Sequence, residues 1–473
     1  MSHPHRNASF WLTISFFLFF GTNEVRAQES EFDRWKRQQA QEYQDFQTAE
    51  DKAFIKFLRL EWEAFQVYQG NIRDLKPKPP TPPTVRNNID ISAGYTGSAA
   101  FTQKRRTTKQ SIRLDDFYGF SVAPLTFPVR QLDGLDQPTQ AAIADAWSSL
   151  SAVDHESILQ SIRQYRKQLG LGDWGLIQLL DLLLQPQYAS KNARMCYVWY
   201  VLTKMGYNVK VGYTSQTLLL LVPPSNKLFG IRYSVIDGQS YYMVPEPTEA
   251  TVYSYDEHFK PQLSLFDFSL NTLIKPTQKT ETRELDYVYK RKPLKLNIHY
   301  DMGLSDFLYD YPQIDLPGYF LYSPGPRVSE SLRDQIKPAL RTLTTRERIN
   351  YLLGLTQAIF QYETDTDQFG REKYMVVEES LYYGVNDCED RSIFLAWLIH
   401  DLLKLPVVVL DYPGHVALAV RTEFTPEDDT VSFQGRKYLV VDPTYLGASA
   451  GMAMPSTLAL TPEILPVSYV SVN

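Results

Sequence analysis

The sequence predicts an α+β fold in which a helix that carries a cysteine packs on an antiparallel sheet. Apolar residues recur at helical spacing over 393–403, directly after Cys388, which indicates a buried helix. Three short apolar runs follow at 406–410, 414–420 and 435–441, each bounded by Gly, Pro or Asp, and these are typical of strands. A helix followed by three strands joined by short turns favours one compact helix-on-sheet unit.

Three residues with complementary chemistry lie at the edges of these segments. Cys388 opens the predicted helix, His415 enters the second predicted strand, and Asp442 follows the third. A thiol is a weak nucleophile until a base such as imidazole removes its proton, and a carboxylate on the far ring nitrogen holds the imidazole in place. We therefore predict a catalytic triad of Cys388, His415 and Asp442. The alternative is that the cysteine and histidine are ordinary buried residues of the core.

The order and spacing of these motifs resemble a known superfamily. The run Asp387-Cys388-Glu389-Asp390 precedes the helix, Pro-Gly-His ends at 415, and Asp-Pro-Thr spans 442–444. Residues 340–450 resemble the transglutaminase-like superfamily of papain-type thiol enzymes, and the acidic run is similar to that of bacterial periplasmic transglutaminase-like cysteine proteinases. Arg391 departs from the proteinase pattern, in which an aromatic residue is common at that position.

The resemblance implies a papain/transglutaminase-like core and a set of roles. Cys388 would be the nucleophile, His415 the base and Asp442 the residue that orients the base. The oxyanion hole would use the backbone N–H of Cys388 and a second donor upstream, for which Tyr382 and Tyr383 are candidates.

The acidic residues around the cysteine allow two interpretations. Asp387, Glu389 and Asp390 lie at the start of a helix, where the helix dipole favours negative charge. In the resembling proteinases, carboxylates that flank the nucleophile help to hold calcium, and carboxylate oxygens suit this hard cation. The expected cofactor is therefore either none or calcium.

The predicted chemistry is acyl transfer through a thioester on Cys388. With water as the acceptor the protein would be a cysteine peptidase, and with an amine it would be a crosslinking enzyme. We expect a peptidase with a protein or peptide substrate. The alternative is a non-enzymatic periplasmic or surface protein that binds proteins or glycans on a transglutaminase-like scaffold.

Composition narrows the classes of partner. The 473-residue chain has a net charge of −6 and lacks a basic stripe, which argues against a nucleic-acid partner. It contains only two cysteines, Cys196 and Cys388, so the fold is expected to depend on its core rather than on disulfides.

The N-terminus has the features of a signal peptide. The apolar run at 10–20 is too short to span a bilayer as an ordinary helix, and small residues precede a cleavage point after Ala27. We expect residues 1–27 to be removed, leaving an exported, periplasmic or extracellular protein with no integral membrane span. An uncleaved anchor is the alternative.

Five further segments are predicted along the chain. Residues 28–75 form an amphipathic helical arm, because aromatic and apolar residues recur at broadly helical spacing. Residues 76–90 form a Pro-rich linker. Residues 91–250 form a degenerate transglutaminase-like domain, residues 251–320 a β-rich connector with alternating polarity, and residues 321–473 the domain that carries the triad.

The degenerate domain is inferred from an internal repeat. Short sequence matches recur about 200 positions apart, in the order helix, helix, strand, strand, strand. At this offset Cys388 maps to Tyr188, His415 falls near Thr217, and Asp442 maps to Pro245. None of these three residues can replace its counterpart, so the first copy is expected to be inactive, with Cys196 as a buried core thiol.

Overall fold

The structure is a computed structural model that describes residues 49–61, 65–68, 116–128, 130–255, 263–270, 275 and 277–467. The chain divides into two compact units, Met1–Lys52 and Ala53–Asn473, and the second contains every element described below. The predicted signal peptide, the linker and most of the helical arm lie outside the described residues.

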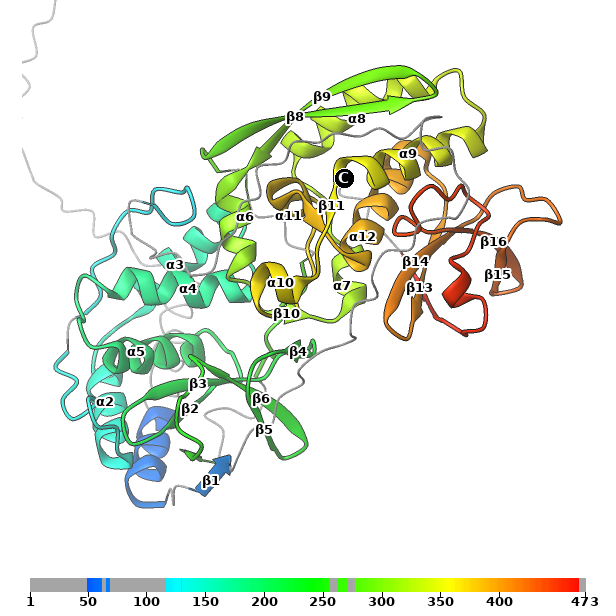
Figure 1. The fold of residues 1–473 in the computed structure, drawn as a ribbon. Helices are drawn as coiled ribbons and strands as arrows, with labels where there is room; N and C mark the ends of the chain where they lie inside the picture. Colours follow the sequence, from blue (N-terminus) through cyan, green and yellow to red (C-terminus); the bar gives the residue numbers. More distant parts are fainter. Residues whose placement is uncertain are drawn as a thin grey trace, which may run out of the picture. The chain divides into compact units, whose positions relative to one another are not determined.

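Four helices precede the first sheet in the central region, which we define as residues 130–255 (Figure 1). They are α2 (Gln140–Ser151), α3 (Glu156–Leu169), α4 (Asp173–Leu184) and α5 (Lys191–Lys204). Two of them begin at hydroxyl N-caps, because Thr139 accepts a hydrogen bond from the backbone N–H of Ala142 and Ser190 accepts one from Ala193.

The sheet of this region is antiparallel, with the strand order β1-β7-β2-β3-β6-β5. Its strands are β1 (Phe65–Tyr68), β2 (Lys210–Tyr213), β3 (Leu218–Val222), β5 (Tyr233–Ile236), β6 (Gln239–Val244) and β7 (Val252–Ser254). Helix α5 packs on β3. Successive residues of β3 belong alternately to the main core and to a smaller cluster on the other side, so both faces of this strand are buried.

Part of the predicted arm is not helical. The π-helical turn η1 (Phe57–Glu61) fits the expectation, whereas Phe65–Tyr68 forms strand β1. The backbone of β1 pairs antiparallel with β7 at the edge of the sheet, and this tertiary pairing outweighs the helical spacing in the sequence.

The connector contains one long hairpin and two short helices. Strands β8 (Thr280–Tyr289) and β9 (Lys292–Asp301) are joined by Lys290 and Arg291, which both have positive φ, as a two-residue hairpin turn requires. Of the two alternating stretches in the sequence, 294–300 lies in β9, whereas 263–270 forms only isolated bridges. The remaining elements are α6 (Met302–Tyr309), β10 (Gln313–Ile314), which pairs with β4 (Leu228–Phe229), and α7 (Leu316–Phe320).

The C-terminal region, residues 321–467, begins with helices. They are α8 (Pro326–Leu340), α9 (Thr345–Ile359), α10 (Asp365–Phe369), α11 (Val377–Tyr383), α12 (Cys388–Leu398) and the π-helical turn η3 (Ile399–Leu403). Two short strands, β11 (Gln361–Tyr362) and β12 (Val385–Asn386), pair in parallel between them.

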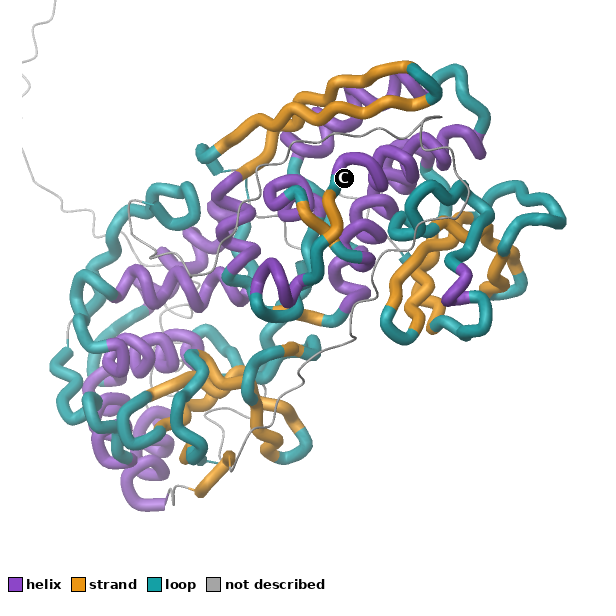
Figure 2. The backbone as a smooth tube through the Cα atoms, viewed as in Figure 1, coloured by secondary structure: helices purple, strands orange, loops and turns teal. Residues whose placement is uncertain are grey.

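A second antiparallel sheet follows, with the order β15-β16-β14-β13-β17. Its strands are β13 (Val407–Tyr412), β14 (His415–Val420), β15 (Thr430–Phe433), β16 (Arg436–Val441) and β17 (Glu463–Pro466). Helix α12 packs on β14, as α5 packs on β3. Figure 2 shows helices beside both sheets, and the predicted α+β class is confirmed.

The three strands predicted after Cys388 are present as β13, β14 and β16, whereas β15 and β17 were not predicted. The two sheets also share a strand order, since β7-β2-β3-β6-β5 corresponds place by place to β17-β13-β14-β16-β15.

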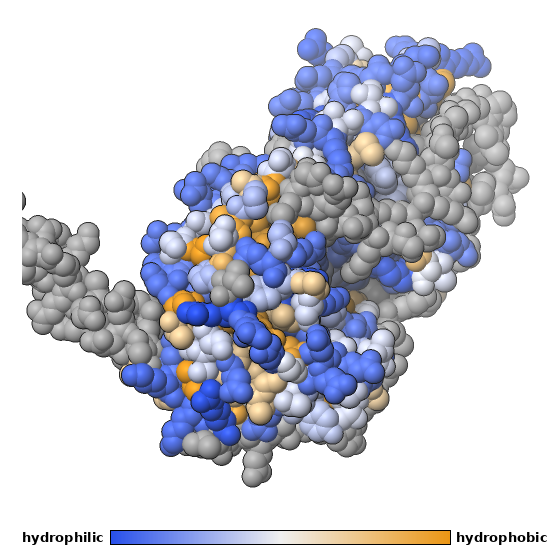
Figure 3. Space-filling model, turned by 90° about the vertical axis from the view of Figure 1, so that its left-hand side faces the viewer, coloured by the Kyte–Doolittle hydropathy of each residue, from blue (hydrophilic) through white to orange (hydrophobic). Residues whose placement is uncertain are grey.

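Large apolar side chains are scattered over the described surface. Those that are well exposed include Val235, Tyr253, Leu265, Phe424 and Leu458. On the face in Figure 3, hydrophilic residues predominate and apolar residues form small groups between them. No helix in the described part of the chain is both long and apolar enough to cross a membrane.

Candidate functional site

The backbone brings Cys388 to the start of a buried helix, as the sequence predicted. Strand β11 pairs with β12 so that Tyr362 lies opposite Asn386. The chain then passes through Asp387, whose extended backbone ends the strand and caps α12, and Cys388 is the first residue of that helix. Every residue of α12 is buried, including the charged residues Glu389, Asp390 and Arg391 that follow the cysteine.

His415 and Asp442 meet on neighbouring strands. His415 is the first residue of β14 and Asp442 follows the last residue of β16, which pairs with β14. The Nε2 atom of His415 lies 2.8 Å from Oδ2 of Asp442. The other oxygen of Asp442 accepts hydrogen bonds from the backbone N–H groups of Thr444 and Tyr445, at 2.9 and 3.2 Å, which fixes the carboxylate.

The second ring nitrogen of His415, Nδ1, is available to accept a proton. Because Nε2 bonds to a carboxylate, it carries the hydrogen in the neutral ring and Nδ1 is the acceptor. Nδ1 is buried and has no hydrogen-bond partner among the described residues. Burial lowers the pKa of His415, but the charge and hydrogen bond of Asp442, together with the charge of Glu389, outweigh it, so the pKa is raised.

The thiol of Cys388 lies beside the start of β14 but bonds to a carboxylate. Ser392, one turn along α12, donates to the carbonyl oxygen of Val416 at 3.0 Å, which ties the helix to the strand that carries His415. The Sγ atom of Cys388 donates to Oε2 of Glu389 at 2.9 Å. Burial raises the pKa of Cys388 well above its ordinary value, and the charges of Glu389 and Asp387 raise it further. In this state the sulfur keeps its proton.

The three residues of the predicted triad are closed off from solvent. The exposed fraction is 0% for Cys388, 2% for His415 and 1% for Asp442. A substrate carbonyl can reach the sulfur only if part of the surrounding chain moves, so the described arrangement is a resting state for any reaction at this thiol.

Three carboxylates cluster just before the cysteine. Asp365, Glu372 and Asp387 each offer an oxygen, and these oxygens all lie within 4.8 Å of one another. All three side chains are buried, and neither oxygen of Asp387 has a hydrogen-bond partner among the described residues. Burial raises the pKa values of Asp365 and Asp387 well above the ordinary range, and neighbouring carboxylate charges add to this.

This cluster fits a hard divalent cation. Calcium takes six to eight oxygen ligands from carboxylates, amide carbonyls and water. Besides the three carboxylates, the amide oxygens of Gln368 and Asn386 are buried and have no partner among the described residues. Gln368 lies in α10 with Asp365, and Asn386 directly precedes Asp387. The three carboxylates supply the negative charge that such an ion requires.

The cluster shares only Asp387 with the residues predicted to bind calcium. Asp387 belongs to the cluster, but Glu389 accepts the hydrogen bond of the Cys388 thiol and Asp390 accepts one from the backbone N–H of Met375 at 2.7 Å. Asp365 and Glu372 were not predicted, since they lie 22 and 15 positions before Asp387 and reach it only through the fold.

Two buried cations lie among these acids. The guanidinium of Arg391 lies 5.7 Å from the ring centroid of Tyr362 and donates to the carbonyl oxygen of Phe360 at 2.9 Å. Burial lowers the pKa of Arg391 to about 10. Lys373 forms an ion pair with Glu379 at 2.6 Å. The charges of Asp387 and Asp390 lie close to the Arg391 guanidinium and favour its charged form.

A tyrosine that was not predicted lies close to the thiol. Tyr382 and Tyr383 lie in α11, and their rings contact each other, Tyr300 and Phe369, as core aromatics do. Tyr362 is the phenol near the nucleophile: burial raises its pKa, and the charges of Cys388 and Asp387 add to this. Pairing with β12 places Tyr362 there, which no local pattern reveals.

Helix α9 holds the loop that follows Asp442. The side-chain amide of Gln357 donates to the carbonyl oxygen of Tyr445 at 2.9 Å and accepts from the N–H of Gly447 at 3.3 Å. Asn350 accepts from the N–H of Ala450 at 2.7 Å, and Arg346 donates to the carbonyl oxygen of the same residue at 2.7 Å. These three side chains place the loop, and with it the acid of the triad.

Arg346 also pairs with Asp428 through two hydrogen bonds. Asp428 precedes β15, so the same arginine links α9 to the edge of the sheet.

In the central region, the three positions predicted to correspond to Cys388, His415 and Asp442 lie beside a helix or a strand. Thr217 directly precedes β3 and Pro245 directly follows β6. Tyr188 lies before α5, whose first residue is Lys191, so Lys191 holds the place that Cys388 has in α12. Cys196 is a buried core thiol as predicted, and burial raises its pKa to about 12.

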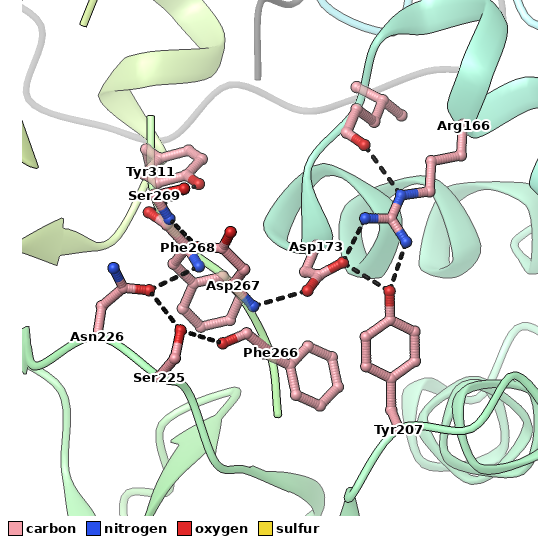
Figure 4. Close-up of polar contacts among 11 residues, drawn as sticks. Arg166, Asp173, Tyr207, Ser225, Asn226, Phe266, Asp267, Phe268, Ser269 and Tyr311 are labelled. Carbon is pink, nitrogen blue, oxygen red and sulfur yellow. Dashed lines mark hydrogen bonds and ion pairs between the residues drawn. The ribbon is translucent and has the colours of Figure 1, made fainter. Parts of the chain in front are cut away.

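A second polar cluster in the central region is structural. Arg166 donates to Asp173 at 2.6 Å, and the hydroxyl of Tyr207 donates to the same oxygen at 2.6 Å (Figure 4). The other oxygen of Asp173 accepts from the backbone N–H of Asp267 at 2.7 Å. Both oxygens are engaged, so the cluster ties α3, α4 and the 263–270 segment together and leaves no group of Asp173 for a ligand.

The arrangement can carry nucleophilic chemistry once the sulfur is uncovered, because a thiol, an imidazole with an available nitrogen and a fixed carboxylate occur together.

Comparison with protein-family models and with curated proteins found no match to this chain.

Proposed function

We propose that this protein is an exported thiol enzyme that transfers acyl groups from peptide or side-chain amides through Cys388, acting as a cysteine peptidase. The observation that carries the proposal is the His415–Asp442 pair, which leaves Nδ1 of the histidine as an acceptor on the strand that packs against the cysteine helix. A thiol is activated when an imidazole can accept its proton and a carboxylate holds that imidazole in place.

The reaction then proceeds in two steps. Nδ1 of His415 takes the thiol proton, and the sulfur of Cys388 attacks the amide carbonyl carbon. The C–N bond breaks as His415 gives that proton to the leaving amine, and a thioester remains. His415 next removes a proton from water, whose oxygen attacks the thioester and releases the carboxylic acid and the thiol. Asp442 holds the ring and stabilises the imidazolium throughout.

The proposal also gives a role to the buried carboxylates near Cys388. Asp365, Glu372 and Asp387 would hold a divalent cation such as calcium, assisted by the amide oxygens of Gln368 and Asn386. The bound ion would supply positive charge beside the helix start and so offset the carboxylates that hold the thiol proton.

The central region is an inactive copy of the same papain/transglutaminase-like unit. The shared strand order of the two sheets, with α5 and α12 placed alike, supports this duplication. Lys191 and Leu218 are the first residues of α5 and β3, as Cys388 and His415 are of α12 and β14. Neither these residues nor the predicted counterparts Tyr188, Thr217 and Pro245 can form a triad.

A second function is favoured by one observation. The thiol of Cys388 is fully buried and its proton is bonded to Glu389, which suits a scaffold that binds a protein or glycan without catalysis.

The rate at which the Cys388 thiol is alkylated distinguishes the enzyme from the non-catalytic scaffold. The rate of reaction of Cys388 with iodoacetamide is measured against pH, with and without calcium, in the chain without residues 1–27 and in its His415→Ala variant. Reaction well below pH 8 that the variant loses supports the enzyme, because an ordinary thiol has a pKa of about 8.5. Cys196 is the internal control and should stay unlabelled in the folded protein.

Slow alkylation that does not depend on His415 would refute the triad and favour the scaffold. If the triad reacts as expected, hydrolysis of an unstructured protein substrate against incorporation of a fluorescent amine distinguishes a peptidase from a crosslinking enzyme.

A further inference from the structure

A cavity of about 610 Å³ in the central region lies between the C-terminal half of α3, the turn after α5 and residues 264–265. Its size falls within the range of about 300–1,000 Å³ that is typical of small-molecule sites. Three cations of α3, Arg163, Arg166 and Lys167, line it, and their spacing of three and four positions puts them on one face of the helix. Arg163 and Lys167 are exposed, so a ligand that enters from solvent can reach their charges.

The third cation, Arg166, is fixed in position by the protein itself. Its guanidinium donates to the carbonyl oxygen of Leu171 at 3.0 Å, to Asp173 and to the hydroxyl of Tyr207 (Figure 4). One N–H on each terminal nitrogen has no partner among the described residues, and 34% of the side chain is exposed. An acceptor in the cavity therefore meets a cation whose position does not have to be ordered on binding.

The lining carries an excess of positive charge. Among the described residues it contains one acid, Asp173, and both oxygens of this acid are already bonded. Lys167 has no ion-pair or hydrogen-bond partner in the described part of the chain. Arg163 pairs with Glu156 at 3.5 Å, but both side chains are about half exposed, and water weakens such a pair. Three cations against one acid leave the lining with a net charge of +2.

Much of the remaining lining is apolar. Met205 directly follows α5, and Leu265 is 40% exposed, so it offers apolar surface to a ligand. Ser264 is exposed beside it and adds a hydroxyl group to the same rim. The cavity thus combines a cationic wall on α3 with apolar side chains from two other segments.

We propose that this cavity binds a small phosphate monoester with an apolar or aromatic body. Such an ester carries a charge of about −1.5 to −2 at pH 7, which is close to the excess of the lining, and its terminal oxygens can accept from the three cations of α3. A monocarboxylate carries only about half of that charge, and a cation would be repelled. The apolar part of the ester would lie against Met205 and Leu265. This site does not depend on acyl transfer by Cys388.

Binding is measured by titration calorimetry at low ionic strength with phenyl phosphate, inorganic phosphate and benzoate as probes. Lys167→Gln removes one charge of the lining and breaks no bond among the described residues, and Leu265→Ser removes apolar surface. Lys337→Gln is the matched control, because Lys337 is also an exposed lysine in the last turn of a helix, α8, and lies outside the cavity.

Phenyl phosphate should bind saturably and more tightly than benzoate. Its dissociation constant should rise by at least about fivefold in Lys167→Gln, because the dianion loses one of its cations, and should not change in Lys337→Gln. Leu265→Ser should weaken the binding of phenyl phosphate and leave that of inorganic phosphate unchanged, since only the ester has an apolar part. All three substituted residues are exposed, so the variants should fold as the wild type does.

The proposal is overturned if phenyl phosphate does not bind, if benzoate binds as tightly, or if Lys167→Gln binds the ester as the wild type does. An equal loss in Lys167→Gln and Lys337→Gln would also overturn it, because this would show general attraction of anions to the surface. An unchanged affinity of phenyl phosphate in Leu265→Ser would refute the apolar contact. No reaction at Cys388 enters these measurements, so their outcome is separate from the fate of the triad.

Discussion

The carboxylate cluster makes a sharp prediction about the stability of the protein. Two unit charges 4.8 Å apart repel each other by about 3.5 kcal/mol at an effective dielectric constant of about 20. Three ionised carboxylates at that spacing would carry about 10 kcal/mol of repulsion, as much as the whole stability of many domains. Asp365, Glu372 and Asp387 must therefore hold protons or a cation.

Calcium at a hundred times its dissociation constant would stabilise the folded chain by about 2.7 kcal/mol. For a domain of about 150–250 residues this corresponds to a rise in melting temperature of roughly 5–11 °C. The affinity should increase with pH, because the ion replaces protons whose binding is favoured by the raised pKa values of Asp365 and Asp387.

The assay is differential scanning calorimetry at constant pH, with calcium and with chelator. Asp387→Asn should raise the melting temperature in chelator, since one charge of the cluster is gone, and should abolish the calcium-dependent rise. Glu378→Gln is the matched control, because Glu378 is an equally buried carboxyl group outside the cluster, and it should keep the calcium effect.

Two results would refute this reasoning. The first is a wild-type melting temperature that calcium does not change, and the second is a calcium effect of the same size in Asp387→Asn. Either would mean that protons alone neutralise the cluster.

Burial raises the pKa of Glu378 from 4.5 to about 7, so the folded state keeps a proton that the unfolded state loses, and this group should reduce stability by about 3 kcal/mol as pH rises from 4.5 to 7. Urea unfolding at about pH 5 and about pH 8 should therefore show a smaller fall in stability in Glu378→Gln than in the wild type, and an equal fall would contradict the prediction. Asp442→Asn should slow the alkylation of Cys388 below pH 8 by at least about tenfold while circular dichroism stays unchanged, and an equal rate would exclude Asp442 from the triad. Leu418→Ala, at the buried centre of β14, should cost about 2–5 kcal/mol of unfolding free energy, whereas Leu458→Ala, at an exposed site, should change it by less than about 0.5 kcal/mol.

Local sequence patterns predicted the elements around the thiol well. The helix that starts at Cys388 and the strands β13, β14 and β16 are encoded by spacing within about ten residues, so each could be identified from its own segment. The contact between His415 and Asp442 was also predictable, because His415 begins one predicted strand and Asp442 follows another, and antiparallel pairing of these two strands brings the two ends together.

Contacts made across the fold were not predictable in this way. Asp365 and Glu372 join Asp387 only because α10 and the loop after it fold back beside β12, and Tyr362 reaches Cys388 only through the β11–β12 pair. In the central region, the offset of 200 positions places Tyr188 before α5, whereas Cys388 is the first residue of α12.

The three side chains of α9 that hold the loop after Asp442 have a consequence for how the sequence can change. Arg346, Asn350 and Gln357 are spaced by four and seven positions, so they lie on one stripe of the helix. An inserted residue between Asn350 and Gln357 would turn the later part of the helix by about 100° and carry Gln357 off this stripe. An insertion in the exposed loop before Asp428 would leave the stripe intact, so length variation should be excluded from α9 and tolerated in that loop.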